Sequence, residues 1–276
     1  MSRSPRYISK LYGRHILVLG GTSGIGFAVA EAALEHGAKV VISSSKQDKV
    51  NRALERLYDV PQPFAMELST PRDASGPPVR GATCDVGDSA TVEANLQALL
   101  DFATSNRTQL LDHVVFTAGD PVGAATYGQS TAEDLQKRQL VRVIAPSILG
   151  KLLPNYVNNT PTSSYTLTSS TIGVKPSPLL TAFTAQSIAV QGLARGLAVE
   201  LKPVRVNAIE FGLVPTELHD LWPQQMKDAV FGKYRATSLT GSTGDVVDAA
   251  EPYLFCMKNA FITGTSIVSD GGVALV

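Results

Sequence analysis

Short apolar runs rich in β-branched residues alternate with longer stretches of helical periodicity along most of the chain. Each apolar run ends near glycine or serine, and apolar residues spaced about 3.6 apart come after it, as in repeated strand-helix-strand units. Such units predict an α/β fold, a doubly wound parallel sheet with helices on both faces. The predicted strands are 15–20, 39–44, 113–119, 164–170, 204–211 and 265–272, and the helices between them include 26–37, 48–58, 132–153 and 179–201.

Two segments interrupt this alternation. Residues 60–81 are rich in proline, and we expect an inserted surface loop there. Residues 215–241 come after a predicted strand and carry the only tryptophan, Trp222, so we expect them to form a substrate lid. Within that lid, His219 is expected to face solvent, with a role as an acid as the alternative. The chain has 276 residues, 44% of them hydrophobic, which suffices for one sizeable core and predicts a single domain over 1–276.

Charge and cysteine content narrow the classes of partner. The 24 Lys and Arg balance 24 Asp and Glu, so no overall field attracts nucleic acid or an anionic membrane, and a small-molecule substrate is expected. The apolar run 16–19 is too short for a signal peptide, and no window approaches a membrane span, which predicts a cytoplasmic protein. Cys84 and Cys256 lack metal-ligand spacing and are expected to be reduced core thiols.

The first predicted strand ends in the glycine-rich sequence LGGTSGIG, which opens an amphipathic helix. Glycines at such a turn let backbone N–H groups at the helix start approach a pyrophosphate. The context of strand, glycine turn and helix therefore predicts a dinucleotide site. Its residues are Gly20, Thr22, Ser23, Gly24, Ile25 and Gly26.

The spacing G-x-x-x-G-x-G resembles that of the short-chain dehydrogenase/reductase family, and further motifs extend the resemblance over nearly the whole chain. They are CDVGD at 84–88, FTAG at 116–119, VRVNAIEFGLVPT at 204–216 and FITGTSIVSDGG at 261–272. The resemblance implies a Rossmann-like fold and a nicotinamide cofactor. It also implies adenine contacts from Asp85 and Val86, a turn beside the cofactor at Ala118 and Gly119, and nicotinamide contacts from Val214 and Thr216.

The end of the second predicted strand bears on the choice between NAD(H) and NADP(H). NAD-specific members carry a carboxylate there, which binds the ribose hydroxyls and repels a 2′-phosphate. This chain has Ser44, Ser45 and Lys46 instead, a set of hydroxyls and an ammonium that favours NADP(H). The alternative is that Lys46 only caps a solvated helix start.

The family's proton relay is largely missing. The resemblance places the family's tyrosine and lysine positions at Phe183 and Ser187, its serine at Ser170 and its asparagine at Arg142. A phenyl ring has no proton to donate, and Ser187 carries no charge. Ketone reduction, which leaves an alkoxide, should therefore be impaired. An iminium already carries its activating charge and becomes a neutral amine on accepting hydride, so its reduction needs no acid.

This pattern also resembles a fungal branch of the family that acts on prenylated indole alkaloids of the malbrancheamide and paraherquamide type. That branch joins NADPH-dependent iminium reduction to an intramolecular [4+2] cycloaddition. The resemblance implies a hydrophobic, prenylated amine or iminium substrate, and it makes Arg142 and Ser170 catalytic candidates. Asp120 is a further catalytic candidate because it comes directly after the predicted strand 113–119, and Phe183 and Trp222 are expected to contact the substrate. The structural alternatives are a surface or interface ion pair for Arg142, a turn-forming residue for Asp120 and lid packing for Trp222.

Two other functions remain open at the level of sequence. One is a carbonyl reductase with an unrecognised proton donor, and the other is a catalytically silent NADP(H)-binding sensor or scaffold. The family resemblance further implies a homo-oligomer.

Overall fold

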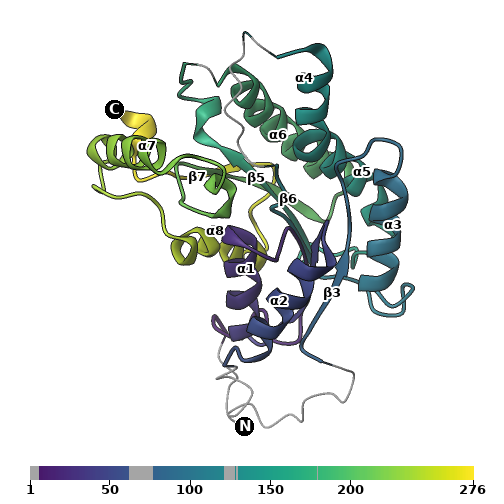
Figure 1. The fold of residues 1–276 in the computed structure, drawn as a ribbon. Coiled ribbons are helices and arrows are strands. Elements are labelled where there is room, and N and C mark those ends of the chain that lie inside the picture. Colours follow the sequence, from purple (N-terminus) through teal and green to yellow (C-terminus); the bar gives the residue numbers. More distant parts are fainter. Residues whose placement is uncertain (1–5, 62–76, 121–127, 129, 179) are drawn as a thin grey trace.

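The structure, a computed structural model, describes residues 6–61, 77–120, 128, 130–178 and 180–276. Seven parallel strands form one sheet in the order β3-β2-β1-β4-β5-β6-β7 (Figure 1). The central strands β1, β4 and β6 are buried at every residue, as expected where helices cover both faces. The strands are β1 His15–Leu19, β2 Lys39–Ser44, β3 Val79–Thr83, β4 His113–Phe116, β5 Ser164–Ser170, β6 Arg205–Phe211 and β7 Ser266–Ser269.

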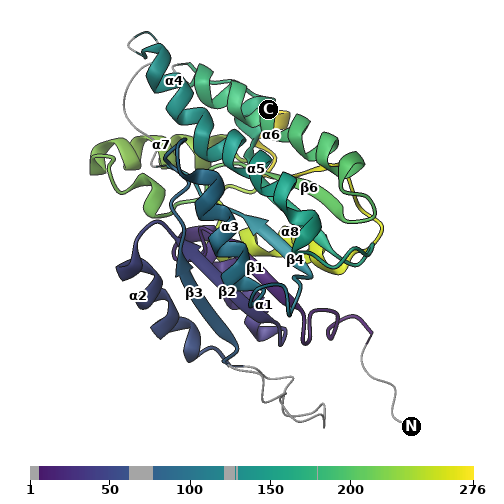
Figure 2. The same cartoon turned by 90° about the vertical axis from the view of Figure 1, so that its right-hand side faces the viewer.

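Two helical layers enclose the sheet, and each has its own hydrophobic core. The core under α3, α5 and α6 lies on the face that Figure 2 turns toward the viewer, and the core under α1, α2 and α8 lies on the other face. The helices are α1 Gly24–Glu35, α2 Gln47–Tyr58, α3 Val92–Ala103, α4 Ala132–Gln139, α5 Ala145–Leu152, α6 Thr181–Glu200, α7 Gln224–Thr237 and α8 Val246–Lys258.

The strand order gives the sheet a switch point between β1 and β4. From β1 the chain moves outward through β2 to β3, and it then crosses back to β4 and moves outward the other way. Loops that leave the carboxyl ends of β1 and β4 therefore diverge, and ligands of doubly wound folds bind in the crevice between them. The predicted doubly wound fold is confirmed, and β2 and β5 have the predicted bounds.

Three local features differ from or complete the expectations. The sequence predicts a loop over 60–81, but β3 begins at Val79, which is fully buried and pairs with Val40; residues 62–76 lie outside the described residues. Cys84 and Cys256 are free and buried, and burial raises the pKa of both thiols to about 12. Among the described residues, no helix is long and apolar enough to cross a membrane.

Candidate active site

The turn between β1 and α1 depends on the absence of side chains at its glycines. Gly20 and Gly24 have φ of 82° and 50°, which disfavours other residues. A Cβ at Gly26 would lie 2.3 Å from both the Gly20 carbonyl oxygen and Thr117 Oγ1. The backbone at the switch point therefore leaves no room for a side chain at Gly26, at the place where a dinucleotide is expected to bind.

The start of α1 suits an anion. Ser23 is the N-cap residue of this fully described helix, yet its side chain makes no capping hydrogen bond, and the first turn contains no acidic residue. The N–H groups of the first turn are thus left without a side-chain acceptor, in the positive field of the helix N-terminus. Together with the close-packed glycines, this arrangement fits the pyrophosphate of a dinucleotide. Thr22 and Ile25 lie in the same turn.

The predicted adenosine side lies at the ends of β2 and β3. Ser44 ends β2 and is half-buried, while Ser45 and Lys46 are exposed, and Lys46 is the uncapped N-cap residue of α2. On the neighbouring strand end, the Asp85 carboxylate accepts a hydrogen bond from the Gly87 N–H at 2.9 Å, and Val86 is buried. Hydroxyls and an ammonium thus lie together where the ribose phosphate is expected. The first turn of α2 beside them carries Asp48, which pairs with Arg52.

A π-helical turn, Leu140–Ile144, separates α4 from α5, although the sequence predicts one continuous helix over 132–153. Such turns are rare and frequently lie at functional sites, because the extra residue changes the direction of side chains relative to the flanking helix. Arg142 lies in this turn. A Cβ built on Gly119 would lie 2.0 Å from Arg142 Nη2, so the guanidinium lies directly against the glycine that comes after β4.

Arg142 points into the molecule and does not form a surface ion pair within the described residues. Burial lowers the pKa of Arg142, and the nearby Asp120 and Tyr253 oppose that shift. Partial desolvation raises the pKa of Asp120, which is exposed at the rim, and Arg142 acts in the opposite direction. A cation and a carboxylate therefore lie within each other's field at the carboxyl end of β4; their catalytic roles stay predictions.

The residues at the relay positions cannot act as the family's acid and lysine. Phe183 and Ser187 lie one turn apart on α6, and the Ser187 hydroxyl donates to the Phe183 carbonyl at 2.8 Å. The guanidinium of Arg138 lies 5.6 Å from the centre of the Phe183 ring. Ser170, at the end of β5, donates to the Phe211 carbonyl at 3.1 Å and accepts from the Ile172 N–H at 3.3 Å.

A buried tyrosine near Arg142 is not among the residues predicted from the sequence. Tyr253 of α8 is fully buried, and its hydroxyl lies 2.6 Å from Thr168 Oγ1, which donates to the Phe116 carbonyl at 2.7 Å. Burial raises the pKa of Tyr253, so it stays protonated. Spacing along the chain gives no sign of it, because α8 reaches the end of β5 only through packing of the folded chain.

The segment predicted to form a lid, residues 215–241, and Val214 just before it come after β6 and include the remaining predicted residues. Val214 is buried, and Thr216 is the N-cap residue of a short 3₁₀ turn, Glu217–His219. Trp222 contacts the His219 ring at a centroid distance of 4.7 Å. His219 is only 6% exposed, so the expectation of a solvent-facing histidine is wrong; Trp222 and Phe231 cover its ring.

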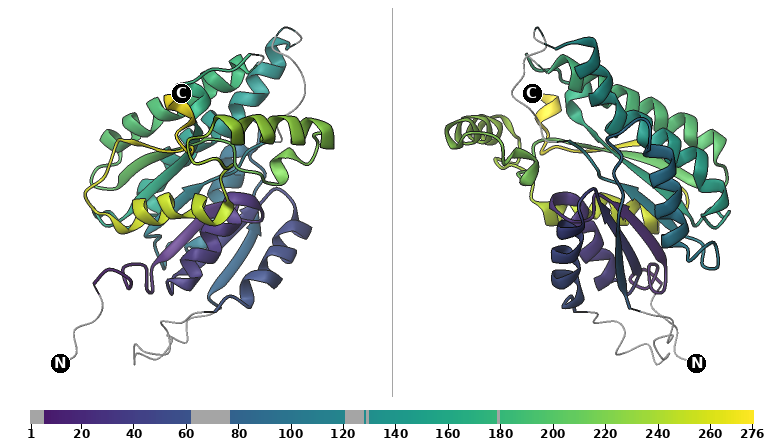
Figure 3. Two further views of the ribbon diagram at one scale, coloured as in Figure 1. Left: turned by 90° about the vertical axis from the view of Figure 1, so that its left-hand side faces the viewer. Right: turned by 45° about the vertical axis from the view of Figure 1, so that its right-hand side comes forward.

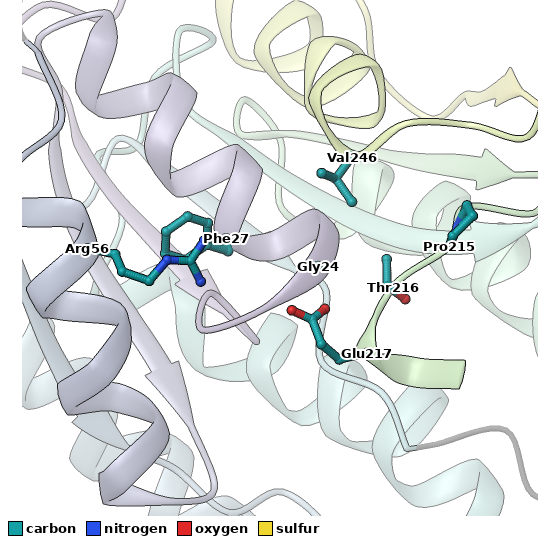
Figure 4. Close-up of a pocket in the computed structure, with 7 residues that line it drawn as sticks. All are labelled: Gly24, Phe27, Arg56, Pro215, Thr216, Glu217 and Val246. Carbon is teal, nitrogen blue, oxygen red and sulfur yellow. The ribbon is translucent and has the colours of Figure 1, made fainter. Parts of the chain in front are cut away.

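A groove of about 400 Å³ joins the start of α1 to the loop after β6 (Figure 4). The Arg56 guanidinium lies flat over the Phe27 ring, 3.8 Å from its centre, and forms one wall. This groove lies beside Gly24 and Thr216 on the expected cofactor side and does not include the residues at the end of β5. It is lined by Gly24, Phe27, Arg56, Pro215, Thr216, Glu217 and Val246.

Comparisons with known proteins agree with this geometry. The chain matches the model of an SDR-like Rossmann domain over residues 7–276. The short-chain dehydrogenase/reductase ucsE of Acremonium sp is 40% identical over 267 residues, 97% of either chain, and malC of Malbranchea aurantiaca is 37% identical over 276 residues, 100% of either chain. The solved structure of the MalC reductase/Diels-Alderase from Malbranchea aurantiaca matches with a TM-score of 0.87 at 38% identity, covering 98% of this chain and 99% of that one. The chain belongs to the short-chain dehydrogenase/reductase family of oxidoreductases.

Proposed function

We propose that this enzyme uses NADPH to reduce an imine or iminium in the biosynthesis of an alkaloid, and that its pocket also directs an intramolecular [4+2] cycloaddition. The observation that carries the proposal is the pair Phe183 and Ser187 on α6, which stand where the family places its acid and its lysine. The similarity to a protein described as a reductase/Diels-Alderase supports the second activity.

The residues around the glycine turn support binding of a phosphorylated dinucleotide. Its pyrophosphate would be held by the N–H groups at the start of α1, and its 2′-phosphate by Ser44, Ser45 and Lys46. When bound, the dihydronicotinamide supplies hydride. Thr216 and Val214, after β6, would orient that ring, and Gly119 would let it lie close to the end of β4.

The groups near the reacting centre favour a cationic acceptor of hydride. An iminium becomes a neutral amine without protonation, so a phenyl ring at 183 is no obstacle. The absence of a lysine at 187 removes a charge that would repel a cationic substrate, and Asp120 offsets the charge of Arg142. A ketone would instead leave an alkoxide, for which neither Phe183 nor Ser187 provides a matched acid.

Cycloaddition needs orientation more than proton transfer. Holding the alkene over the azadiene that forms after reduction can lower the barrier by several kcal/mol, because little further freedom is lost in the transition state. Arg142 is half-buried against Gly119, and it would donate hydrogen bonds to a substrate carbonyl or polarise the diene. Phe183 and Trp222 would contact the aromatic and isoprenoid parts of the substrate.

The test is stopped-flow loss of NADPH absorbance with a cyclic iminium and a ketone of matched shape. We expect turnover of the iminium and little of the ketone by the wild-type enzyme. The double substitution Phe183→Tyr with Ser187→Lys should restore ketone reduction, with Ser187→Lys alone as the control. Efficient ketone turnover by the wild type, without iminium turnover, would overturn the proposal; NADPH binding without consumption of any acceptor would point to a sensor or scaffold.

A further inference from the structure

His219 contacts both the backbone of Thr216, in the loop after β6, and two aromatic side chains further along the predicted lid. It ends the 3₁₀ turn Glu217–His219, and its Nδ1 lies 3.4 Å from the Thr216 backbone nitrogen and 3.2 Å from the Thr216 carbonyl oxygen. Its ring also meets Trp222 and Phe231 edge-on, at centroid distances of 4.7 and 5.6 Å, and those two rings lie 6.4 Å from each other. One buried imidazole thus contacts the main chain of a proposed cofactor residue and two rings of the lid.

The lid helix α7 has few other attachments. It contains no buried residue along its described length, and Figure 3 shows it at the outer edge of the molecule, apart from the helices packed on the sheet. The Tyr234 hydroxyl donates to the Asp270 carbonyl at 2.7 Å, and Lys227 pairs with Asp220 at 3.8 Å. A helix with so little buried surface is fixed by individual contacts, and Phe231 against His219 is one of them.

Thr216 and His219 form a capping box at the start of the 3₁₀ turn. Thr216 Oγ1 accepts from the Leu218 N–H at 3.4 Å, while the His219 ring reaches back to the Thr216 backbone. Nδ1 serves either the N–H or the carbonyl of Thr216 according to its tautomer, and in both cases it fixes the same peptide segment. Burial lowers the pKa of His219, which favours the neutral form of the ring.

We propose that His219 is a positioning residue that couples the placement of Thr216 to the placement of α7. This inference rests on the proposed function, because Thr216 is a cofactor residue only in that proposal. A dinucleotide that orders Thr216 would then order the lid, and the same coupling free energy would make an ordered lid favour the dinucleotide. Substrate would meet a formed wall of Trp222 and Phe231 only after the cofactor has bound.

Two substitutions separate the two ends of this connection. His219→Phe keeps a ring against Trp222 and Phe231 but removes the nitrogen that faces Thr216. His219→Asn keeps a polar atom able to serve the Thr216 backbone but removes the ring. If His219 only filled space, both substitutions would change stability and leave cofactor affinity untouched. A positioning role predicts instead that both raise the Kd of NADP⁺, and that His219→Asn also abolishes the response of Trp222 to NADP⁺.

The probe is NADP⁺, which does not absorb where tryptophan emits, so that Trp222, the only tryptophan, reports on the lid without energy transfer. Calorimetry gives the NADP⁺ Kd, and Trp222 emission with acrylamide quenching gives the state of the lid. We expect NADP⁺ to shield Trp222 in the wild type. We expect His219→Phe to raise the Kd about fivefold, as for a lost hydrogen bond. We expect His219→Asn to lose the Trp222 response and, because the coupling is reciprocal, to raise the Kd as well.

Phe231→Leu supplies a second test that leaves His219 intact, and it serves even where a histidine variant fails to fold. It should weaken the Trp222 response and raise the Kd by the part of the coupling that is lost. The inference is overturned if the wild type binds NADP⁺ without any change at Trp222, if both histidine variants bind and respond as the wild type does, or if Phe231→Leu keeps the full response. A wild type that binds neither NADP⁺ nor NADPH would instead overturn the proposed function.

Discussion

Gly119→Ala should displace the Arg142 guanidinium without removing its charge. The backbone of Gly119 is not in the left-handed region, so alanine is conformationally allowed there. The added Cβ would lie 2.0 Å from Arg142 Nη2, and this separation must grow to the 3.4 Å of ordinary contact, a shift of about 1.4 Å. The guanidinium can move because it is the far end of a flexible side chain, so the fold should lose no more than about 1 kcal/mol.

The catalytic effect should be far larger than the effect on stability. Misplacing a positioned group by about 1 Å costs on the order of 100-fold in rate, or about 2.7 kcal/mol of transition-state stabilisation. We therefore expect single-turnover consumption of NADPH with an iminium to slow by about that factor. Gly192→Ala, on α6 with no atom within 4 Å of the added Cβ, is the matched control and should leave the rate unchanged.

The Arg142→Ala background identifies the cause. If alanine at 119 acts by moving the guanidinium, it should add little once the guanidinium is gone, and the double variant should match Arg142→Ala alone. Displacement of the Arg142 guanidinium is ruled out as the cause if Gly119→Ala slows the reaction by the same factor in the wild-type and Arg142→Ala backgrounds. That outcome would mean that the Cβ obstructs the cofactor itself, and calorimetry with NADP⁺ would then show a raised Kd.

Two further predictions concern cofactor choice and acid stability. Lys46→Ala should raise the Kd of NADPH roughly tenfold and leave that of NADH nearly unchanged, because only NADPH has a 2′-phosphate; equal changes in both, measured by calorimetry, would contradict the assignment of Lys46. Burial lowers the pKa of His113 to about 3, whereas the unfolded chain takes up that proton near pH 6.5. The free energy of unfolding should therefore fall as the pH drops from 6.5 toward 3, and this residue should contribute up to about 1.4 kcal/mol per pH unit. Urea unfolding of His113→Gln should show a free energy that depends less on pH by that amount.

The strands and the glycine turn are predictable because their signals are local. Apolar runs bounded by serine or glycine predict β2 and β5 with their observed ends, and the glycine turn has the tight backbone that its spacing requires. The predicted strand 113–119 is longer than β4, because the residues after Phe116 leave the sheet to form the switch-point loop.

The site is less predictable, since its geometry arises from packing between distant segments. The π-helical turn at 140–144 has no sequence signature, and apolar periodicity there is compatible with an uninterrupted helix. In the sequence His219 is only a polar residue in a lid, and it is buried because α7 folds back onto the 3₁₀ turn. Tyr253 has the pattern of an ordinary core residue of α8, and only the pairing of β4 with β5 brings Thr168 and the Phe116 carbonyl to its hydroxyl.

The π-helical turn also fixes the direction of the side chain at position 142, so the residue type there decides which chemical group lies at the end of β4. The direction of the side chain at 142 is set by the helix register, and each residue added to or removed from an α-helix rotates all later residues by about 100°. A substitution at 142 keeps that register, so a different side chain placed there starts in the same direction, toward Gly119. Variation at this one position can therefore exchange an amide, a cation or an acid at the end of β4 while the glycine turn and the sheet stay as they are.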